Sequence, residues 1–148
     1  MLTEQLFDFL AASPSCYHAV RAISDRLITD GYTQLREQDA WTLVPGGKYF
    51  TTRNGSSLIA FRVPEGAPAG FLMAAAHTDS PTFKIKHNPE KKAGPYVQLS
   101  TEKYGGMLMG TWFDRPLSVA GRVVTAKDGK LETKLVDVDR DLLVIPSV

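Results

Sequence analysis

The sequence contains little that would place the protein in a membrane or in an oxidising compartment. Its single cysteine, Cys16, excludes a disulfide within the chain. No apolar run approaches the roughly 20 residues that a membrane-spanning helix needs. The N-terminal stretch MLTEQLFDFLAAS carries two acidic residues and no basic one, unlike a signal peptide. A lone cysteine agrees with a reducing compartment. We therefore expect a cytoplasmic protein with no membrane partner.

The chain also lacks a large excess of either positive or negative charge. Its 17 Lys and Arg residues nearly cancel its 16 Asp and Glu residues, which leaves a net charge of +1. A nucleic-acid partner would therefore depend on a local patch. The one candidate has almost no interleaved aromatic residues, and it consists of Lys84, Lys86, Lys91 and Lys92. We interpret it as a solvated stretch and expect no nucleic-acid partner. With 148 residues, 43% of them hydrophobic, the chain can bury a core.

Two helices are predicted at the start of the chain. Residues 3–12 place apolar side chains at helical spacing behind Thr3, a suitable N-cap. A second helix is predicted to begin near Ser15 and to end before Gly31, which suits a left-handed C-terminal cap.

Strands are predicted next. Residues 48–53 and 57–63 flank an Asn54-Gly55 pair, which favours a hairpin. Residues 71–76 are continuously apolar, which is typical of a central strand covered on both faces.

The second half is predicted to be mostly β. A polar, basic bridge at 84–95 indicates a domain boundary. The strand candidates beyond it are residues 96–102, 119–126, 131–138 and 142–145.

His77 and Asp79 follow the predicted central strand. In an extended backbone, residues i and i+2 point to the same side, so the two can lie together at the strand end, where open α/β sheets place their sites. A neutral imidazole can bind a metal through one nitrogen while a carboxylate accepts from the other. The alternative is a satisfied polar histidine and an aspartate that caps the turn at Ser80-Pro81. The pair supplies one ligand, whereas a catalytic zinc needs about three.

Other candidates are weaker. His18 is interpreted as a packing or capping residue, His87 as a solvated one and Cys16 as an inert thiol without a nearby base. Asp114, in the segment TWFDRP, has two interpretations. One is a turn fixed by an aromatic anchor and an Asp-Arg ion pair, and the other is a metal-bridging carboxylate. We favour the first.

Four blocks, taken in order, carry a resemblance. They are SPSCYHAV (13–20), GGKYFTTRNGSSLIAF (46–61), AAHTDSP (75–81) and YGGMLMGTWFDRPLSVAGRV (104–123). Together they cover nearly the whole chain and resemble the aspartyl aminopeptidase family of zinc metallopeptidases. In this resemblance His77 matches the first metal-ligating histidine. Asp79 matches the catalytic-site aspartate that supports it.

The resemblance implies a cytoplasmic, zinc-dependent exopeptidase with two metal ions. It would remove N-terminal Asp or Glu from peptides and assemble into a homo-oligomer. The implied fold is α/β: residues 1–83 would be the N-terminal part of an α/β/α catalytic sandwich, and residues 84–148 the first part of an inserted β-rich dimerisation domain. The Trp-Phe-Asp-Arg-Pro block would belong to that insertion, which argues against Asp114 as a ligand.

In the family, the other metal ligands and the catalytic glutamate lie beyond the position that matches residue 148. We therefore expect this chain to be an N-terminal piece that is inactive by itself. The alternative function is a non-catalytic oligomerisation or regulatory module derived from the same family.

Overall fold

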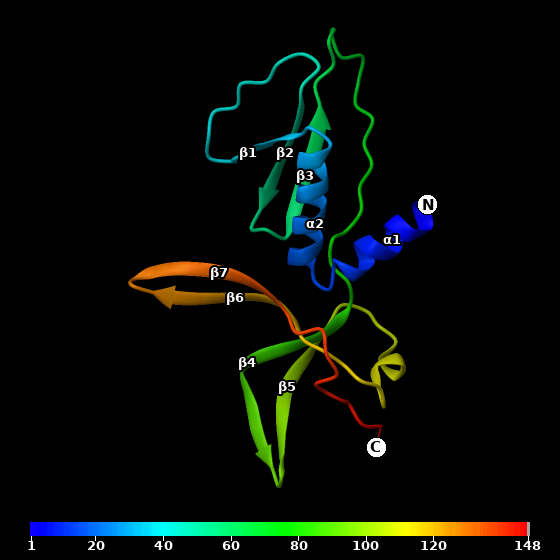
Figure 1. The fold of residues 1–148 in the computed structure, drawn as a ribbon, viewed down its shortest axis with the longest axis vertical. Coiled ribbons are helices and arrows are strands. Elements are labelled where there is room, and N and C mark those ends of the chain that lie inside the picture. The colour runs from blue at the N-terminus through cyan, green and yellow to red at the C-terminus, as the bar shows by residue number, and fades with distance from the viewer. Residues whose placement is uncertain (148) are drawn as a thin grey trace. The chain divides into compact units, whose positions relative to one another are not determined.

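A computed structural model describes residues 1–147 and confirms a mixed α/β chain (Figure 1). Its elements are α1 (Leu2–Ala11), α2 (Cys16–Thr29), β1 (Thr33–Leu35), β2 (Lys48–Arg53), β3 (Ser57–Arg62), β4 (Thr82–Ala93), β5 (Tyr96–Tyr104), the 3-10 helix η1 (Met109–Trp112), β6 (Ala120–Lys127) and β7 (Lys130–Asp137). They form two compact units. The first contains Met1–Asp79 and Ser118–Arg140, and the second contains Ser80–Leu117 and the segment from Asp141 onward.

Both predicted helices are confirmed, but the start of the first was predicted wrongly. Thr3 lies inside α1, and Met1 takes the N-cap position. The terminal ammonium of Met1 pairs with the Glu4 carboxylate, and this pair stabilises the first turn without a threonine cap. Helix α2 begins after Ser15, and Gly31 follows its C-terminal end with a φ of +81°.

The core of the first unit lies between α2 and a three-stranded sheet. The strand order is β1-β2-β3, with β1 parallel and β3 antiparallel to the central β2. Ala19 and Val20 of α2 and Tyr49 and Phe50 of β2 are buried, and Phe50 is fully inaccessible. Burial of these side chains stabilises the packing of α2 against the sheet.

The predicted β2–β3 hairpin is confirmed. Asn54 and Gly55 form its turn with φ values of +54° and +64°, the left-handed region required at both central positions of a type I′ turn. Ser56, directly after this turn, contacts the segment that carries His77.

A close approach of backbone to ring precedes β2. A Cβ at Gly47 would lie 2.5 Å from Cε2 of Tyr49, so only glycine fits without movement of that ring. The Tyr49 hydroxyl accepts a hydrogen bond from the Val44 N–H at 3.0 Å, and its ring lies 5.7 Å from that of Phe61.

The prediction of a central strand at 71–76 is wrong for this chain. The segment belongs to none of the sheets formed by residues 1–147, and Phe71, Leu72 and Met73 are 92%, 103% and 85% exposed. A central strand needs a hydrogen-bonding neighbour on each side and cover on both faces. The described part of the chain supplies neither, so the apolar pattern alone does not produce the strand.

The polar bridge is a strand and not a linker. β4 pairs antiparallel with β5, and the register shifts between Ile85 and Glu90. Asn88, with a φ of +51°, and Pro89 lie inside this shift. Proline has no N–H to donate to a strand ladder. It is therefore tolerated at such a bulge, where the ladder bonds are interrupted. The solvent-exposed polar side chains of β4 explain why its sequence resembles a linker.

The remaining strand predictions have mixed outcomes. The hairpin β6–β7 confirms two of them. The candidate at 142–145 is reduced to one antiparallel bridge between Leu117 and Leu143. The division into a catalytic part, 1–83, and a dimerisation part, 84–148, stays a prediction. The compact units are defined by contacts between residues, and such contacts do not show what each part does.

Candidate metal centre

The structure brings His77 and Asp79 together, as predicted. Nδ1 of His77 lies 2.6 Å from the backbone oxygen of Asp79 and 3.1 Å from its Oδ1. Both oxygens are acceptors, so a neutral imidazole must carry its proton on Nδ1 to bond them. The lone pair of that tautomer is then on Nε2. The His77 side chain is 78% exposed.

Thr78 fixes this turn to the sheet. Its hydroxyl donates to the Ser56 carbonyl at 2.7 Å, and Ser56 directly follows the Asn54-Gly55 turn of the β2–β3 hairpin. A partly buried hydroxyl–carbonyl bond of this length is well formed. The segment that carries His77 therefore has a polar anchor on the first unit, although it joins none of the sheets formed by residues 1–147.

Arg122 of β6 contacts the same hairpin turn. Its Nη1 donates to the backbone oxygen of Asn54 at 2.7 Å and to its Oδ1 at 3.1 Å. Its guanidinium carbon lies 4.2 Å from the centroid of the Tyr17 ring in α2, a cation–π geometry. Arg122 thus links α2, β6 and the β2–β3 turn.

The donor set at His77 fits part of a zinc site. Nε2 is an appropriate zinc ligand, and the oxygens of Asp79 hold the ring in the tautomer that a metal requires. Across residues 1–147, however, no three His, Cys, Asp or Glu side chains gather closely enough to hold a metal ion. His77 with Asp79 would therefore supply one ligand and its support.

The other two histidines have different environments. His18 lies at the start of α2, where its Nδ1 is 2.8 Å from the Ser15 hydroxyl, in agreement with the predicted capping role. His87 is exposed on β4, as predicted for a solvated residue.

Asp114 contacts the C-terminal segment instead of forming the predicted ion pair within its own turn. Its carboxylate accepts hydrogen bonds from the Ser147 hydroxyl and, at 2.9 Å, from the Ser147 N–H. The hydroxyl bond first, and then the backbone bond, lower the pKa of Asp114 below its ordinary value. The predicted Asp-Arg ion pair is wrong, since Arg115 reaches towards the Thr111 carbonyl. Serine donors are uncharged but satisfy the carboxylate directly.

The aromatic anchor predicted beside Asp114 is confirmed. The rings of Phe83 and Trp112 meet edge to face, with centroids 5.6 Å apart.

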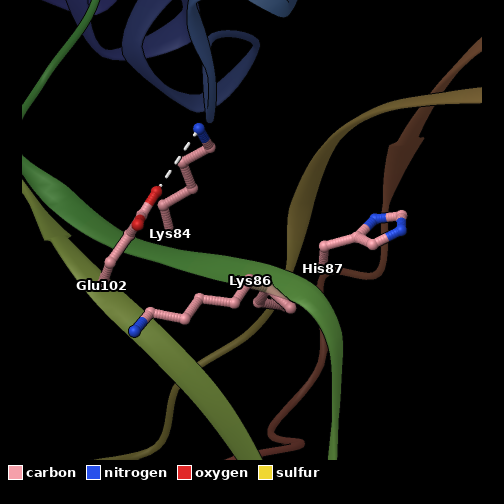
Figure 2. A pocket seen from close by; sticks show the side chains of 5 residues that line it. Lys84, Lys86, His87 and Glu102 are labelled. Carbon is pink, nitrogen blue, oxygen red and sulfur yellow. Dashed lines mark ion pairs between the residues drawn. The ribbon is translucent and has the colours of Figure 1, made fainter.

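A surface hollow of about 620 Å³ lies on the β4–β5 hairpin (Figure 2). Lys84 and Glu102 point toward one another on one side of it and form an ion pair at 3.5 Å, whereas His87 points away. Both charges of the pair are largely exposed, so it contributes little to stability. The lysines at 84, 86, 91 and 92 are all exposed, as predicted for a solvated stretch.

Comparison with known proteins identifies the family. Residues 9–148 match the family of aminopeptidase I zinc metalloproteases, M18. The chain belongs to this family. It is 46% identical over 149 residues to a probable M18 family aminopeptidase 2 of Pseudomonas putida (strain GB-1), covering 99% of this chain and 35% of that protein. The chain thus spans about a third of the length of this relative.

Solved structures of M18 aminopeptidases agree. Chaetomium thermophilum mApe1 superimposes with a TM-score of 0.92 at 42% identity, over 99% of this chain and 34% of that one. The S. cerevisiae mApe1 dodecamer gives a TM-score of 0.87 at 29% identity, over 99% of this chain and 36% of that one. These matches confirm the expected α/β fold of an M18 aminopeptidase.

Sequence reasoning missed the roles of Thr78 and Arg122. Thr78 stands between two residues that were singled out, but its partner is 22 positions away. Arg122 lies 68 positions from Asn54. No local spacing rule signals contacts of this kind.

Residues 1–147 contain no helix that is both long and apolar enough to cross a membrane.

Proposed function

We propose that the complete protein carrying this chain is a zinc-dependent aminopeptidase that removes aspartate or glutamate from the N-terminus of peptides. The observation that carries the proposal is the turn at His77, in a chain that belongs to the M18 family. There, Asp79 holds the proton on Nδ1 and leaves Nε2 for a metal. The acidic specificity rests on the resemblance of the four sequence blocks.

In this proposal His77 holds zinc through Nε2, and Asp79 orients the ring and increases its basicity. Zinc, when bound, supplies an acidified water and polarises a carbonyl. The resemblance implies two metal ions. The resemblance implies that the remaining ligands and the general base lie beyond the position that matches residue 148. We propose that residues 1–148 alone are inactive.

The peptide substrate and the assembly follow from the same proposal. To select a peptide with an acidic N-terminal residue, a basic side chain of the enzyme would donate a charge-assisted hydrogen bond to the carboxylate of that residue. Self-association is supported by the dodecamer that the S. cerevisiae relative forms. We further propose that residues 1–83 belong to the catalytic domain and 84–148 to an inserted dimerisation domain, and that the protein is cytoplasmic.

The test compares two histidine variants of the complete natural protein. Zinc content per chain and release of aspartate, glutamate and leucine from matched peptides are measured for His77→Ala and His87→Ala. His77→Ala should lose both bound zinc and acidic-aminopeptidase activity. His87→Ala removes an exposed imidazole on β4 and should behave as the unsubstituted protein.

Three results would contradict the proposal. Full zinc content and activity in His77→Ala would remove His77 from the site. Faster release of leucine than of either acidic residue would refute the specificity. A protein that assembles but cleaves none of the peptides would favour a non-catalytic oligomerisation module.

A further inference from the structure

The segment that delivers His77 has few constraints of its own. Residues 71–77 join no strand ladder in the described chain, and Phe71, Leu72 and Met73 are almost fully exposed. Any freedom left to the turn that carries His77 would have to be restricted when a metal binds. Any contact that restricts the segment beforehand reduces that cost.

Thr78 makes such a contact immediately beside the candidate ligand. Its hydroxyl donates to the Ser56 carbonyl at 2.7 Å, and Thr78 itself is half-buried. A hydrogen bond is directional, so it restricts the orientation of the Thr78 side chain and of the peptide units on either side. Those peptide units belong to His77 and Asp79.

The Ser56 carbonyl is itself held in a rigid turn. The Ser56 N–H donates to the Arg53 carbonyl at 3.1 Å, and the hairpin register pairs Arg53 with Ser57. Arg122 adds two hydrogen bonds to Asn54 in the same turn. The acceptor of the Thr78 hydroxyl is therefore fixed from both sides.

We propose that Thr78 is a positioning residue for the metal centre: its hydroxyl ties the His77–Asp79 turn to the β2–β3 hairpin and so presents Nε2 of His77 in one orientation. The inference rests on the proposed role of His77 as a ligand. It assigns Thr78 no contact with metal or substrate. Its effect is on the affinity and geometry of metal binding.

The test uses three threonine variants of the complete natural protein. Thr78→Val keeps the shape of the side chain and removes the hydroxyl, whereas Thr78→Ser keeps the hydroxyl. Thr29→Val is the matched control, because the Thr29 hydroxyl donates to a backbone carbonyl, that of Asp25, at 2.9 Å within α2. Zinc affinity is measured by competition with a chelating dye, and site geometry by the visible absorption of the Co²⁺-substituted protein.

Loss of a group that orients a metal ligand typically weakens metal binding by roughly ten- to a hundredfold. We expect Thr78→Val to weaken zinc affinity by about tenfold and to shift the absorption spectrum of the Co²⁺-substituted protein. Thr78→Ser should restore both the affinity and the spectrum, and Thr29→Val should change neither. A merely structural role for Thr78 would leave the Co²⁺ spectrum unchanged.

His77→Ala, measured in parallel, separates the possible failures. If His77→Ala loses zinc while Thr78→Val binds it normally, the proposed function stands and the positioning role is overturned. Equal losses in Thr78→Val and Thr29→Val would also overturn it, since general destabilisation would then explain both. Normal zinc binding by His77→Ala would refute the ligand assignment and the positioning role together.

Discussion

Arg122 should control the local stability of the β2–β3 turn. Arg122→Met retains much of the aliphatic stem and removes the guanidinium, and with it two hydrogen bonds to Asn54 and the contact with the Tyr17 ring. A hydrogen bond from a charged donor contributes about 1.5–3 kcal/mol and an exposed cation–π contact about 0.5–1 kcal/mol. Because both bonds come from one solvent-accessible nitrogen, Nη1, we count them once at the low end, which together with the ring contact lowers the free energy of opening the turn by about 2 kcal/mol.

Amide hydrogen exchange measures that opening directly. A loss of about 2 kcal/mol corresponds to exchange that is roughly thirtyfold faster at the Ser56 N–H, which bonds to Arg53 across the turn. Amides of the β4–β5 hairpin, in the other compact unit, serve as the internal control. Unchanged exchange at Ser56 would refute the reasoning. Equal acceleration in β4–β5 would also refute it, because the effect would then be global.

Two further variants divide the contribution of Arg122. Asn54→Gly removes only the Oδ1 acceptor, and glycine adopts the φ of +54° without strain. Tyr17→Leu removes the ring. In a double-mutant cycle, Arg122→Met and Tyr17→Leu should show a coupling of about 0.5–1 kcal/mol. Strict additivity would mean that the ring contact contributes nothing.

Three more predictions concern packing and charge. Phe50→Ala should destabilise the first unit by about 3–5 kcal/mol in urea titrations, because it empties a fully buried site. Gly47→Ala should cost about 1–3 kcal/mol, whereas Gly66→Ala, where a new Cβ meets no atom within 4 Å, should be near neutral; equal effects would disprove the proposed clash. The folded pKa of Asp114 lies below its ordinary value, so the stabilising contact with Ser147 is present above that ordinary value and is lost as the pH falls through the folded pKa. Acid should therefore speed proteolysis of the C-terminal segment, and Asp114→Asn should abolish that acid dependence.

The parts of the fold that could be predicted are those with local signals. The β2–β3 hairpin follows from an Asn-Gly pair, whose residues tolerate the left-handed backbone of a tight turn, between two β-prone runs. Helix α2 follows from its apolar spacing between Ser15 and Gly31. The proximity of His77 and Asp79 follows from their separation of two residues.

The errors arise where neighbours decide the structure. The segment 71–76 has the composition of a central strand but no ladder partner among the described residues. β4 has the composition of a linker, yet it pairs with β5 across a bulge that accommodates Pro89. The anchors of the candidate site, from Thr78 to Ser56 and from Arg122 to Asn54, join residues 22 and 68 positions apart. Composition and periodicity contain no information about such pairings.

Two different forces should act on the segment that carries His77. Burying Phe71, Leu72 and Met73 would contribute about 1.5–3 kcal/mol for each side chain, far more than the roughly 1 kcal/mol of one neutral hydrogen bond. Hydrophobic burial is non-directional, however, and does not fix the rotation of an imidazole. The hydrogen bond of Thr78 is weaker but directional. In the complete protein, Thr78→Val should therefore change the geometry of the metal site more than it changes the free energy of unfolding.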